Sequence, residues 1–304
     1  MLKLRNLLED ANPAKFDKDR MPQKLSQVDP DTAAAQVTGG TKDGDTKDDV
    51  IPVSNASPSI SKLKPSQTSM NNPKAMSFVV RALNKEEPFN GADVLGGNAG
   101  DLGAFMSEDG HILDGHHRWI AAGMVNPNAT MAVNKIEWPV DPILNVLNAM
   151  TKGMFKIGKG KPASGGFEQF AKAPIEKAID DVIANGNSFG DSPEKVKAAF
   201  TRLIGQEGQT VDDATLAAQT KAIITKNIGD LDFSLPTDSP ERPDMPVISF
   251  KAGHVKQAIQ ALEKGEVDVN PPYADAPVED GYKPTKPLLE SNWKRFQKIA
   301  NIKK

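Results

Sequence analysis

Apolar residues recur at two spacings between residues 59 and 140, and each spacing predicts one kind of element. Spacing of three and four residues predicts a helix over 73–83. Alternation of apolar and polar residues predicts short strands at 59–63, 104–108, 111–114 and 132–138. The dipeptide Asp109-Gly110 predicts a tight hairpin turn of type I′ between two of these strands. This region is therefore expected to be a small mixed sheet with helices.

Glycines mark two changes of structure inside this region. The segment 89–103 carries five of them and is expected to be a loop. Gly115 follows the strand at 111–114 and is expected to open a helix that closes near Gly123.

Downstream, helical spacing predominates. It predicts helices at 143–152, 167–184, 193–204, 212–227 and 254–264. Ser192 and Pro193 have the residue types of an N-cap and a first helical position. Residues 288–302 are expected to form an amphipathic helix at the C-terminus. The fold class predicted for the chain is α+β, with the small mixed sheet followed by a mainly helical region.

The N-terminal segment is poor in the residues that build a core. Residues 17–77 contain no Phe, Tyr or Trp, and residues 26–58 contain five large aliphatic residues among many Pro, Thr, Asp and Gly. Such a composition favours a linker. Four parts are predicted: a flexible arm 1–58, an α+β domain 59–140, a helical domain or appendage 141–265, and a Pro-rich connector with a terminal helix 266–304.

Composition narrows the classes of function. The 37 Lys and Arg residues nearly balance 40 Asp and Glu residues, so no chain-wide basic field favours wrapping by nucleic acid. The apolar runs are too short for a transmembrane helix, and no membrane partner is expected. The absence of cysteine excludes disulfides, zinc–thiolate sites and cysteine nucleophiles. It fits an intracellular setting such as the cytoplasm.

The segment 112–122 carries the most informative chemistry. Its strand, glycine turn and helix start place Gly115, His116, His117 and Arg118 where unpaired amides and the helix dipole attract an anion. Arg118 can grip phosphate oxygens with two hydrogen bonds, and the histidines can donate hydrogen bonds or exchange a proton. A surface cap is the alternative for the two histidines, which diverge by about 100° on a helix and are poorly placed to chelate one metal together.

Asp114 lies at the strand end beside this anion site. It is a candidate general base, a candidate ligand of a divalent cation such as Mg²⁺, and a candidate for orienting a histidine. A structural cap of the following helix is an equal alternative on geometry alone. Asp114, His116 and His117 are the catalytic candidates.

A second basic segment follows the α+β region. Lys156 and Lys159 belong to a Gly/Lys-rich stretch without acidic residues, which could follow a phosphate backbone or close over a nucleotide. A solvated loop is the alternative. The Gly-x4-Gly-Lys spacing over 153–159 is that of a P-loop, but Gly160 stands where the magnesium-binding Ser or Thr would be.

The string Asp114-Gly-His-His-Arg-Trp119 resembles the helix start of the ParB/sulfiredoxin superfamily, in the form found in phage and archaeal ParB-like proteins. Residues 63–67 are similar to the opening strand of that superfamily and its Pro-x-Gln exit, and 131–138 to the strand after the helix. The likeness covers about 59–140. Sulfiredoxin chemistry is excluded because His116 replaces the cysteine, and the basic, helix-turn-helix form of a chromosome-partitioning ParB is not evident.

The resemblance implies a nucleotide ligand, ATP, ADP or CTP, whose phosphate lies in the cradle formed by Gly115, His116, His117 and Arg118. It implies a catalytic or metal-orienting role for Asp114, as in the serine kinases of the superfamily, which also use an upstream glutamate. Glu86 and Glu87 are the candidates for that residue.

Two kinds of function fit these features. One is a ParB-like kinase, NTPase or nuclease that transfers or cleaves a phosphoryl group on a nucleic acid or a small hydroxyl compound. The other is a non-catalytic, nucleotide-gated protein with a structural role, for example a virion-associated phage protein with assembly proteins as partners.

Overall fold

The computed structural model describes residues 24–42, 49–187, 189–248 and 253–269. They fall into two compact units. The sheet unit comprises 54–136 and 161–243, and the second unit comprises the described parts of 1–53, 137–160 and 244–304. The terminal helix predicted at 288–302 lies outside the described residues.

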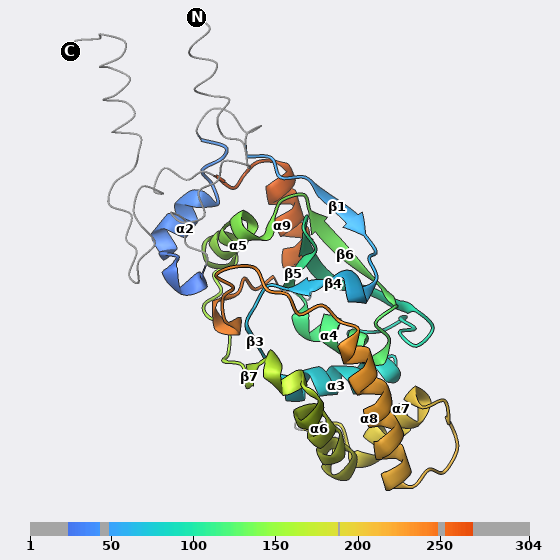
Figure 1. The fold of residues 1–304 in the computed structure, drawn as a ribbon. Helices are drawn as coiled ribbons and strands as arrows, with labels where there is room; N and C mark the ends of the chain where they lie inside the picture. Colours follow the sequence, from blue (N-terminus) through green and yellow to red (C-terminus); the bar gives the residue numbers. More distant parts are fainter. Residues whose placement is uncertain (1–23, 43–48, 188, 249–252, 270–304) are drawn as a thin grey trace, which may run out of the picture. The chain divides into compact units, whose positions relative to one another are not determined.

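The sheet unit is built on one mixed five-stranded sheet, with the strand order β1-β6-β4-β5-β2. Figure 1 labels β1, β6, β4 and β5. Strand β4 pairs antiparallel with β5 and parallel with β6, and β2 pairs parallel with β5. The strands are β1 Val53–Ala56, β2 Lys64–Pro65, β4 Asn98–Ser107, β5 His111–Asp114 and β6 Thr130–Ile136. This sheet and the helices that follow it confirm the predicted α+β class.

The predicted hairpin between β4 and β5 is confirmed, but its turn differs from the prediction. A type I′ turn would require a positive φ at both Asp109 and Gly110. Gly110 has a φ of 87°, but Asp109 does not have a positive φ. Gly110 N–H donates to the Ser107 carbonyl at 3.1 Å. One glycine in the left-handed region therefore closes the turn.

Two other local predictions were wrong. Residues 60–62 form the 3₁₀-helix η4 Ile60–Lys62 rather than a strand, because the Ile60 and Leu63 amides bond to Ala129 and Ile60 carbonyls instead of a strand partner. Strand β4 begins at Asn98, inside the segment predicted to be a loop. Gly100 and Gly103 have positive φ there, and the pairing with β6 shifts register around them.

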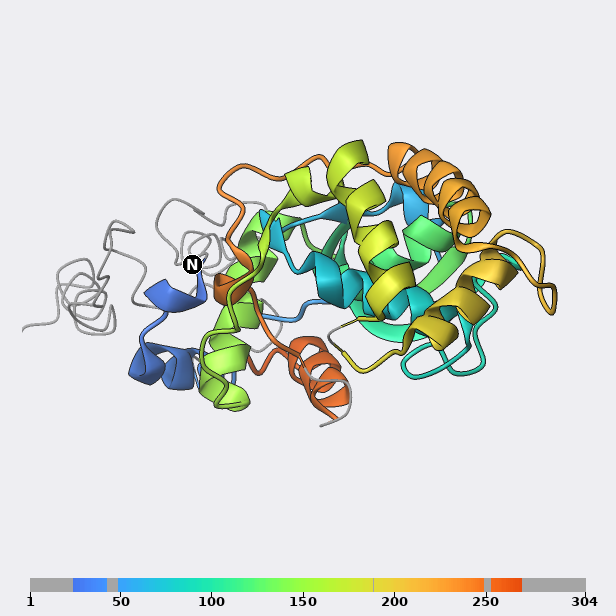
Figure 2. The ribbon, with the colours of Figure 1, turned by 90° about the horizontal axis from the view of Figure 1, so that it is seen from below.

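The helices of the sheet unit lie in two layers beside the sheet. Helices α3 Asn72–Leu83 and α4 His116–Val125 pack against each other, and α8 packs on α4 while α7 packs on α3. Figures 1 and 2 show this second layer on the side of α3 and α4 away from the sheet. It consists of α6 Lys172–Asn185, α7 Pro193–Leu203 and α8 Asp213–Gly229.

Local signals explain several helix boundaries. The Ser192 hydroxyl accepts from Lys195 N–H at 3.3 Å, as predicted for an N-cap. Helix α4 continues past Gly123 to Val125. Gly123 does not end the helix but allows close packing, since a Cβ at this position would lie 2.9 Å from the Leu231 side chain. Trp119 is fully buried and its indole N–H donates to the Ile60 carbonyl at 3.1 Å, so this side chain belongs to the core.

Two short strands complete the sheet unit. Strands β3 Ser69–Met70 and β7 Gly165–Gly166 pair antiparallel, and the 3₁₀-helix η6 Phe167–Phe170 follows β7. The segment 66–71, which contains β3, thus joins β2 to α3.

The second unit contains helices where the sequence predicted a flexible arm. They are η3 Leu25–Gln27 and α2 Pro30–Gln36. Helix α2 packs against α5 Val140–Ala149 and the π-helix η5 Met150–Met154, and α9 His254–Glu263 belongs to the same unit. The 3₁₀-helix η7 is Arg242–Asp244, and its first two residues are assigned to the sheet unit. Leu25 and Ala33 are fully buried. Gln36 Nε2 donates to Asn145 Oδ1 at 3.1 Å, so the partners of this segment come from distant parts of the chain. Within the described residues, no helix is long and apolar enough to cross a membrane.

Candidate functional site

The glycine turn between β5 and α4 is required by the backbone. Gly115 has φ 107° and ψ 10°, in the left-handed region that favours glycine. A Cβ at this position would lie 2.9 Å from the Cβ of Ala104 and 3.3 Å from Arg118 Nη2. The turn brings the strand end at Asp114 and the first turn of α4 to one place, as the sequence predicted.

The two histidines of this turn hold a neighbouring loop. His116 Nε2 accepts from the Ser66 amide and His117 Nε2 from the Asn71 amide, each at 3.1 Å. These two amides bracket the segment 66–71 between β2 and α3. An accepting Nε2 leaves the proton of a neutral imidazole on Nδ1.

Both histidines are neutral in this environment. Burial, followed by the positive charge of Arg118, lowers the pKa of His116 to about 3. Burial and the charges of Lys74 and Arg242 lower the pKa of His117 to about 2. Near neutral pH the two rings therefore add no positive charge to the site, and their catalytic role stays a prediction.

Asp114 and Arg118 face each other across the turn. Arg118 Nη2 lies 3.3 Å from Asp114 Oδ2, and Arg118 Nη1 donates to the Leu102 carbonyl. Burial raises the pKa of the Asp114 carboxyl, although Arg118, the Gly115 amide and Lys74 each pull it down. The carboxyl is thus a better proton acceptor than an exposed aspartate.

Two further cations lie near this pair, and sequence reasoning missed both. Lys74 is in the first turn of α3, and its ammonium lies 5.6 Å from the ring centre of Phe78. Burial lowers the pKa of Lys74, as do Arg242 and Arg118, whereas Asp114 raises it. A lysine after Pro73 at a predicted helix start was the available signal for Lys74. Arg242 had none, because it lies in a proline-rich stretch far along the chain.

The name cationic cluster is used below for Lys74, Arg118 and Arg242 together with Asp114, which forms an ion pair with Arg118. Among the described residues, no carboxylate lies within ion-pair distance of Lys74 or Arg242. The cluster therefore carries more positive than negative charge at the positive end of the α4 dipole.

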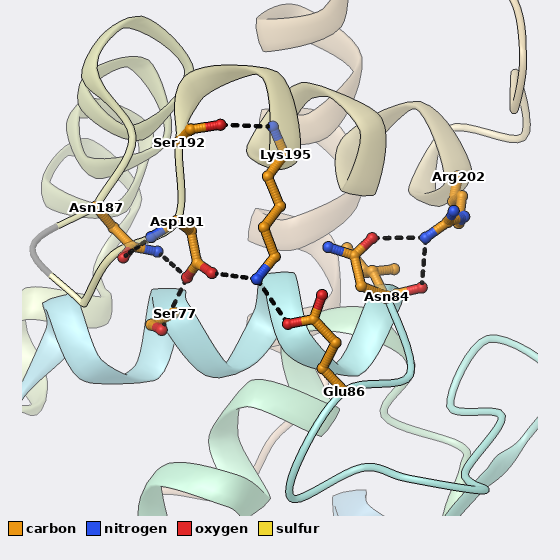
Figure 3. A network of polar contacts seen from close by, with 9 residues as sticks. Ser77, Asn84, Glu86, Asn187, Asp191, Ser192, Lys195 and Arg202 are labelled. Atoms are coloured by element: carbon orange, nitrogen blue, oxygen red, sulfur yellow. Dashed lines mark hydrogen bonds and ion pairs between the residues drawn. The ribbon is translucent and has the colours of Figure 1, made fainter.

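Glu86 and Glu87 belong to the opposite end of α3. Lys195 Nζ lies 2.6 Å from Glu86 Oε2 and 2.7 Å from Asp191 Oδ1 (Figure 3). Glu87 Oε1 accepts from Asn90 at 3.0 Å. Helix α3 is about 18 Å long over its twelve residues; Lys74 lies in its first turn, whereas both glutamates follow its last turn. Neither glutamate is brought to Asp114.

Lys156 and Lys159 lie in the second unit. Lys159 Nζ is 3.4 Å from Asp244 Oδ1, and Lys156 has a positive φ of 57°. A helix precedes this stretch, rather than the strand of a P-loop. Gly153 is explained by packing, since a Cβ there would lie 2.3 Å from the Ala33 carbonyl.

Metal binding stays a prediction for Asp114. In the described ranges, no group of three or more His, Asp or Glu side chains is placed to hold a metal ion. Any cation bound with Asp114 would need oxygen ligands from the phosphate itself, as Mg²⁺ commonly has.

Comparison with protein-family models, with curated proteins and with solved structures gave no match. The likeness to the ParB/sulfiredoxin superfamily therefore stays an expectation, carried by the residues quoted for it.

Proposed function

We propose that this chain binds the phosphate of a nucleotide at the turn between β5 and α4, in the manner expected of a ParB-like protein, and that Asp114 promotes phosphoryl transfer or hydrolysis there. The observation that carries the proposal is the unbalanced charge of the cationic cluster. Arg118 of α4 and Lys74 of α3 both act on the Asp114 carboxylate at this helix N-terminus. Arg242 of η7 lies close enough to Lys74 and His117 for its charge to lower their pKa values. Partly buried positive charge without a counterion is costly, and a phosphate offers the compensating charge.

The glycine turn supports a phosphate over a carboxylate ligand. Gly115 brings bare backbone to the start of α4, where the first helical amides have no acceptor within the helix. Phosphate oxygens can accept several amide and guanidinium hydrogens at once. Arg118 keeps further donors for such a ligand beyond those that contact Asp114 and Leu102.

Asp114 is the group assigned to proton transfer. In the proposed step a hydroxyl or water oxygen forms a bond to phosphorus, the bond from phosphorus to the leaving oxygen breaks, and the hydroxyl proton passes to the Asp114 carboxylate. The raised pKa of Asp114 suits this role. His116 and His117 act here as positioning residues through Ser66 and Asn71. Mg²⁺ is the candidate metal, and ATP, ADP and CTP are the candidate nucleotides.

A nucleotide-gated assembly protein is the second candidate. Both imidazole Nε2 atoms are engaged with backbone amides, which leaves one carboxylate as the acid–base group of the turn. Binding without turnover needs the cationic cluster alone. A nucleic acid or phage assembly proteins are the partners that this candidate implies.

Asp114→Asn separates the two candidates. The amide keeps an accepting oxygen but loses charge and basicity, so catalysis predicts nearly unchanged nucleotide binding with turnover reduced by about a hundredfold. Turnover of ATP and of CTP with Mg²⁺ is measured as the release of phosphate. Nucleotide binding is measured by calorimetry. Asp109→Asn, at the other end of β5, is the matched control.

Full turnover in Asp114→Asn contradicts the catalytic role of Asp114. Saturable nucleotide binding by the parent without turnover supports the assembly protein. Absence of binding by the parent contradicts both candidates.

A further inference from the structure

We infer that Arg242 and Lys74 form a second anion subsite beside Arg118, and that this subsite selects ligands with two linked phosphates over ligands with one. The inference rests on the proposed function, because it specifies the class of ligand for the same site. Its basis is that a residue from a distant connector is fastened beside the first turn of α3.

The connector is fixed to the loop that the histidines hold. Arg242 N–H donates to Ser69 Oγ at 3.0 Å, and Thr68 N–H donates to the Pro240 carbonyl at 2.9 Å. The Asn71 amide, two residues after Ser69, donates to His117. Residues 240–242 are thus attached to the same six-residue segment that meets the start of α4.

The guanidinium of Arg242 is anchored on one side. Its Nη1 donates to the carbonyls of Lys161 and Pro162, which are neutral acceptors. Among the described residues, both hydrogen bonds of the Arg242 side chain are made by Nη1, so Nε and Nη2 remain as donors. An arginine held in this way keeps its full charge and loses little conformational entropy when it binds an anion.

Lys74 is held on the same side of the site. Asn71 Oδ1 accepts from the Lys74 amide at 3.0 Å and so fixes the first turn of α3. The Lys74 ammonium lies over Phe78, and the Arg81 guanidinium lies 5.8 Å from the same ring. The hydrogen bonds of segment 66–71 to His117 and to the Arg242 amide bring the start of α3 beside both arginines. In agreement with this placement, the charges of Arg242 and Arg118 add to burial in lowering the pKa of Lys74.

The charge arithmetic favours a ligand with more than one phosphate. Three cations and one carboxylate leave two positive charges in excess. One phosphate bound at Arg118 and the α4 N-terminus leaves Lys74 and Arg242 without a partner. A second, linked phosphate can reach them, and its binding is then intramolecular.

The test compares AMP with ADP on the parent chain and on Arg242→Gln. The substitution removes the charge but keeps the backbone amide of residue 242, which donates to Ser69 Oγ and attaches the connector to segment 66–71. We expect the parent to prefer ADP at least about tenfold, as a charge-assisted contact predicts. In Arg242→Gln the preference should fall below about threefold, with AMP affinity changed less than about twofold. Arg202→Gln, an arginine of α7, is the control.

The test can reject the second subsite alone, or the second subsite together with the proposed function. Equal affinity of the parent for AMP and ADP, or an undiminished preference in Arg242→Gln, rejects the second subsite and leaves the phosphate site standing. Equal losses for AMP and ADP in Arg242→Gln place Arg242 at the first phosphate and also reject the subsite. Failure of the parent to bind either nucleotide or inorganic pyrophosphate rejects the subsite together with the proposed function.

Discussion

Helix α3 carries a group of charged side chains at each end, and the two groups differ in how their charges are paired. At the C-terminal end, Lys195 lies within 2.7 Å of both Asp191 and Glu86 (Figure 3). Ser77 and Asn187 also donate to Asp191, at 3.0 and 2.6 Å. These five residues are called the clamp. At the N-terminal end, the cationic cluster has one ion pair, at 3.3 Å.

The difference distinguishes a structural network from a ligand site. The clamp joins α7 to α3 with every charged group paired at short distance, which is what a stabilising network requires. The cationic cluster brings cations together and leaves two of them without a carboxylate among the described residues. Repulsion of this kind costs stability unless an anion compensates it, and such arrangements are typical of functional sites.

The largest expected effect comes from breaking the clamp. Asp191 is nearly inaccessible, and Asp191→Ala leaves Ser77, Asn187 and Lys195 without their common acceptor. We expect the free energy of unfolding to fall by about 3–5 kcal/mol, the cost of removing one partner of a buried pair. Urea denaturation measures this, and Asp213→Ala, in an exposed ion pair with Lys197, is the matched control.

Stability within the error of the parent would show that the clamp is not a network. The variant should still bind nucleotide where it remains folded, since Asp191 contacts Ser77, Asn187 and Lys195 and none of the three cations of the cluster. Loss of binding in folded Asp191→Ala would contradict the separation of the two groups.

A smaller effect is expected from pH. The pKa of His116 falls from the usual 6.5 to about 3 on folding, so the fold favours the neutral ring. The contribution of the neutral His116 ring to the free energy of unfolding is fully present above the unfolded pKa of 6.5. It is lost as the pH falls from 6.5 toward the folded pKa of about 3. Between pH 7 and pH 5 this amounts to about 2 kcal/mol. Asp191 of the clamp stays ionised over this interval, because hydrogen bonds from Lys195, Asn187 and Ser77 overcome desolvation and lower the pKa of its carboxyl.

His116→Gln tests this assignment. The glutamine oxygen can accept from the Ser66 amide but does not titrate, so the variant should lose about 2 kcal/mol less than the parent between pH 7 and pH 5. Denaturation curves at the two pH values give the comparison. A parallel pH dependence in both proteins would show that His116 is not held neutral by the fold.

The local sequence predicted the turn between β5 and α4 better than it predicted Lys74, Arg242 and the clamp. The hairpin, Gly115 and the start of α4 depend on neighbouring residues, so their pattern was sufficient. Lys74 and Arg242 reach the site through tertiary packing: Arg242 bonds to Ser69 from 173 residues away. The clamp likewise joins Glu86 to Lys195 across 109 residues, a partner that local sequence could not reveal.

The N-terminal segment shows the same limit. Its composition is typical of a linker, yet Gln36 is buried against Asn145 and the Asp268 carbonyl. Few apolar residues suffice there because buried polar groups are paired across the unit. A count of aromatic residues could not reveal partners supplied by distant segments.

The central claim is that the cationic cluster of Lys74, Arg118 and Arg242 binds phosphate, and pyrophosphate titration by calorimetry tests it most directly. The parent should bind pyrophosphate saturably, and Arg118→Ala should bind at least about tenfold more weakly, the cost of a charge-assisted contact. Lys197→Ala removes an equal charge from the exposed surface of α7 and should change the affinity less than about twofold. Absence of saturable binding by the parent, or unchanged affinity in Arg118→Ala, would contradict the account.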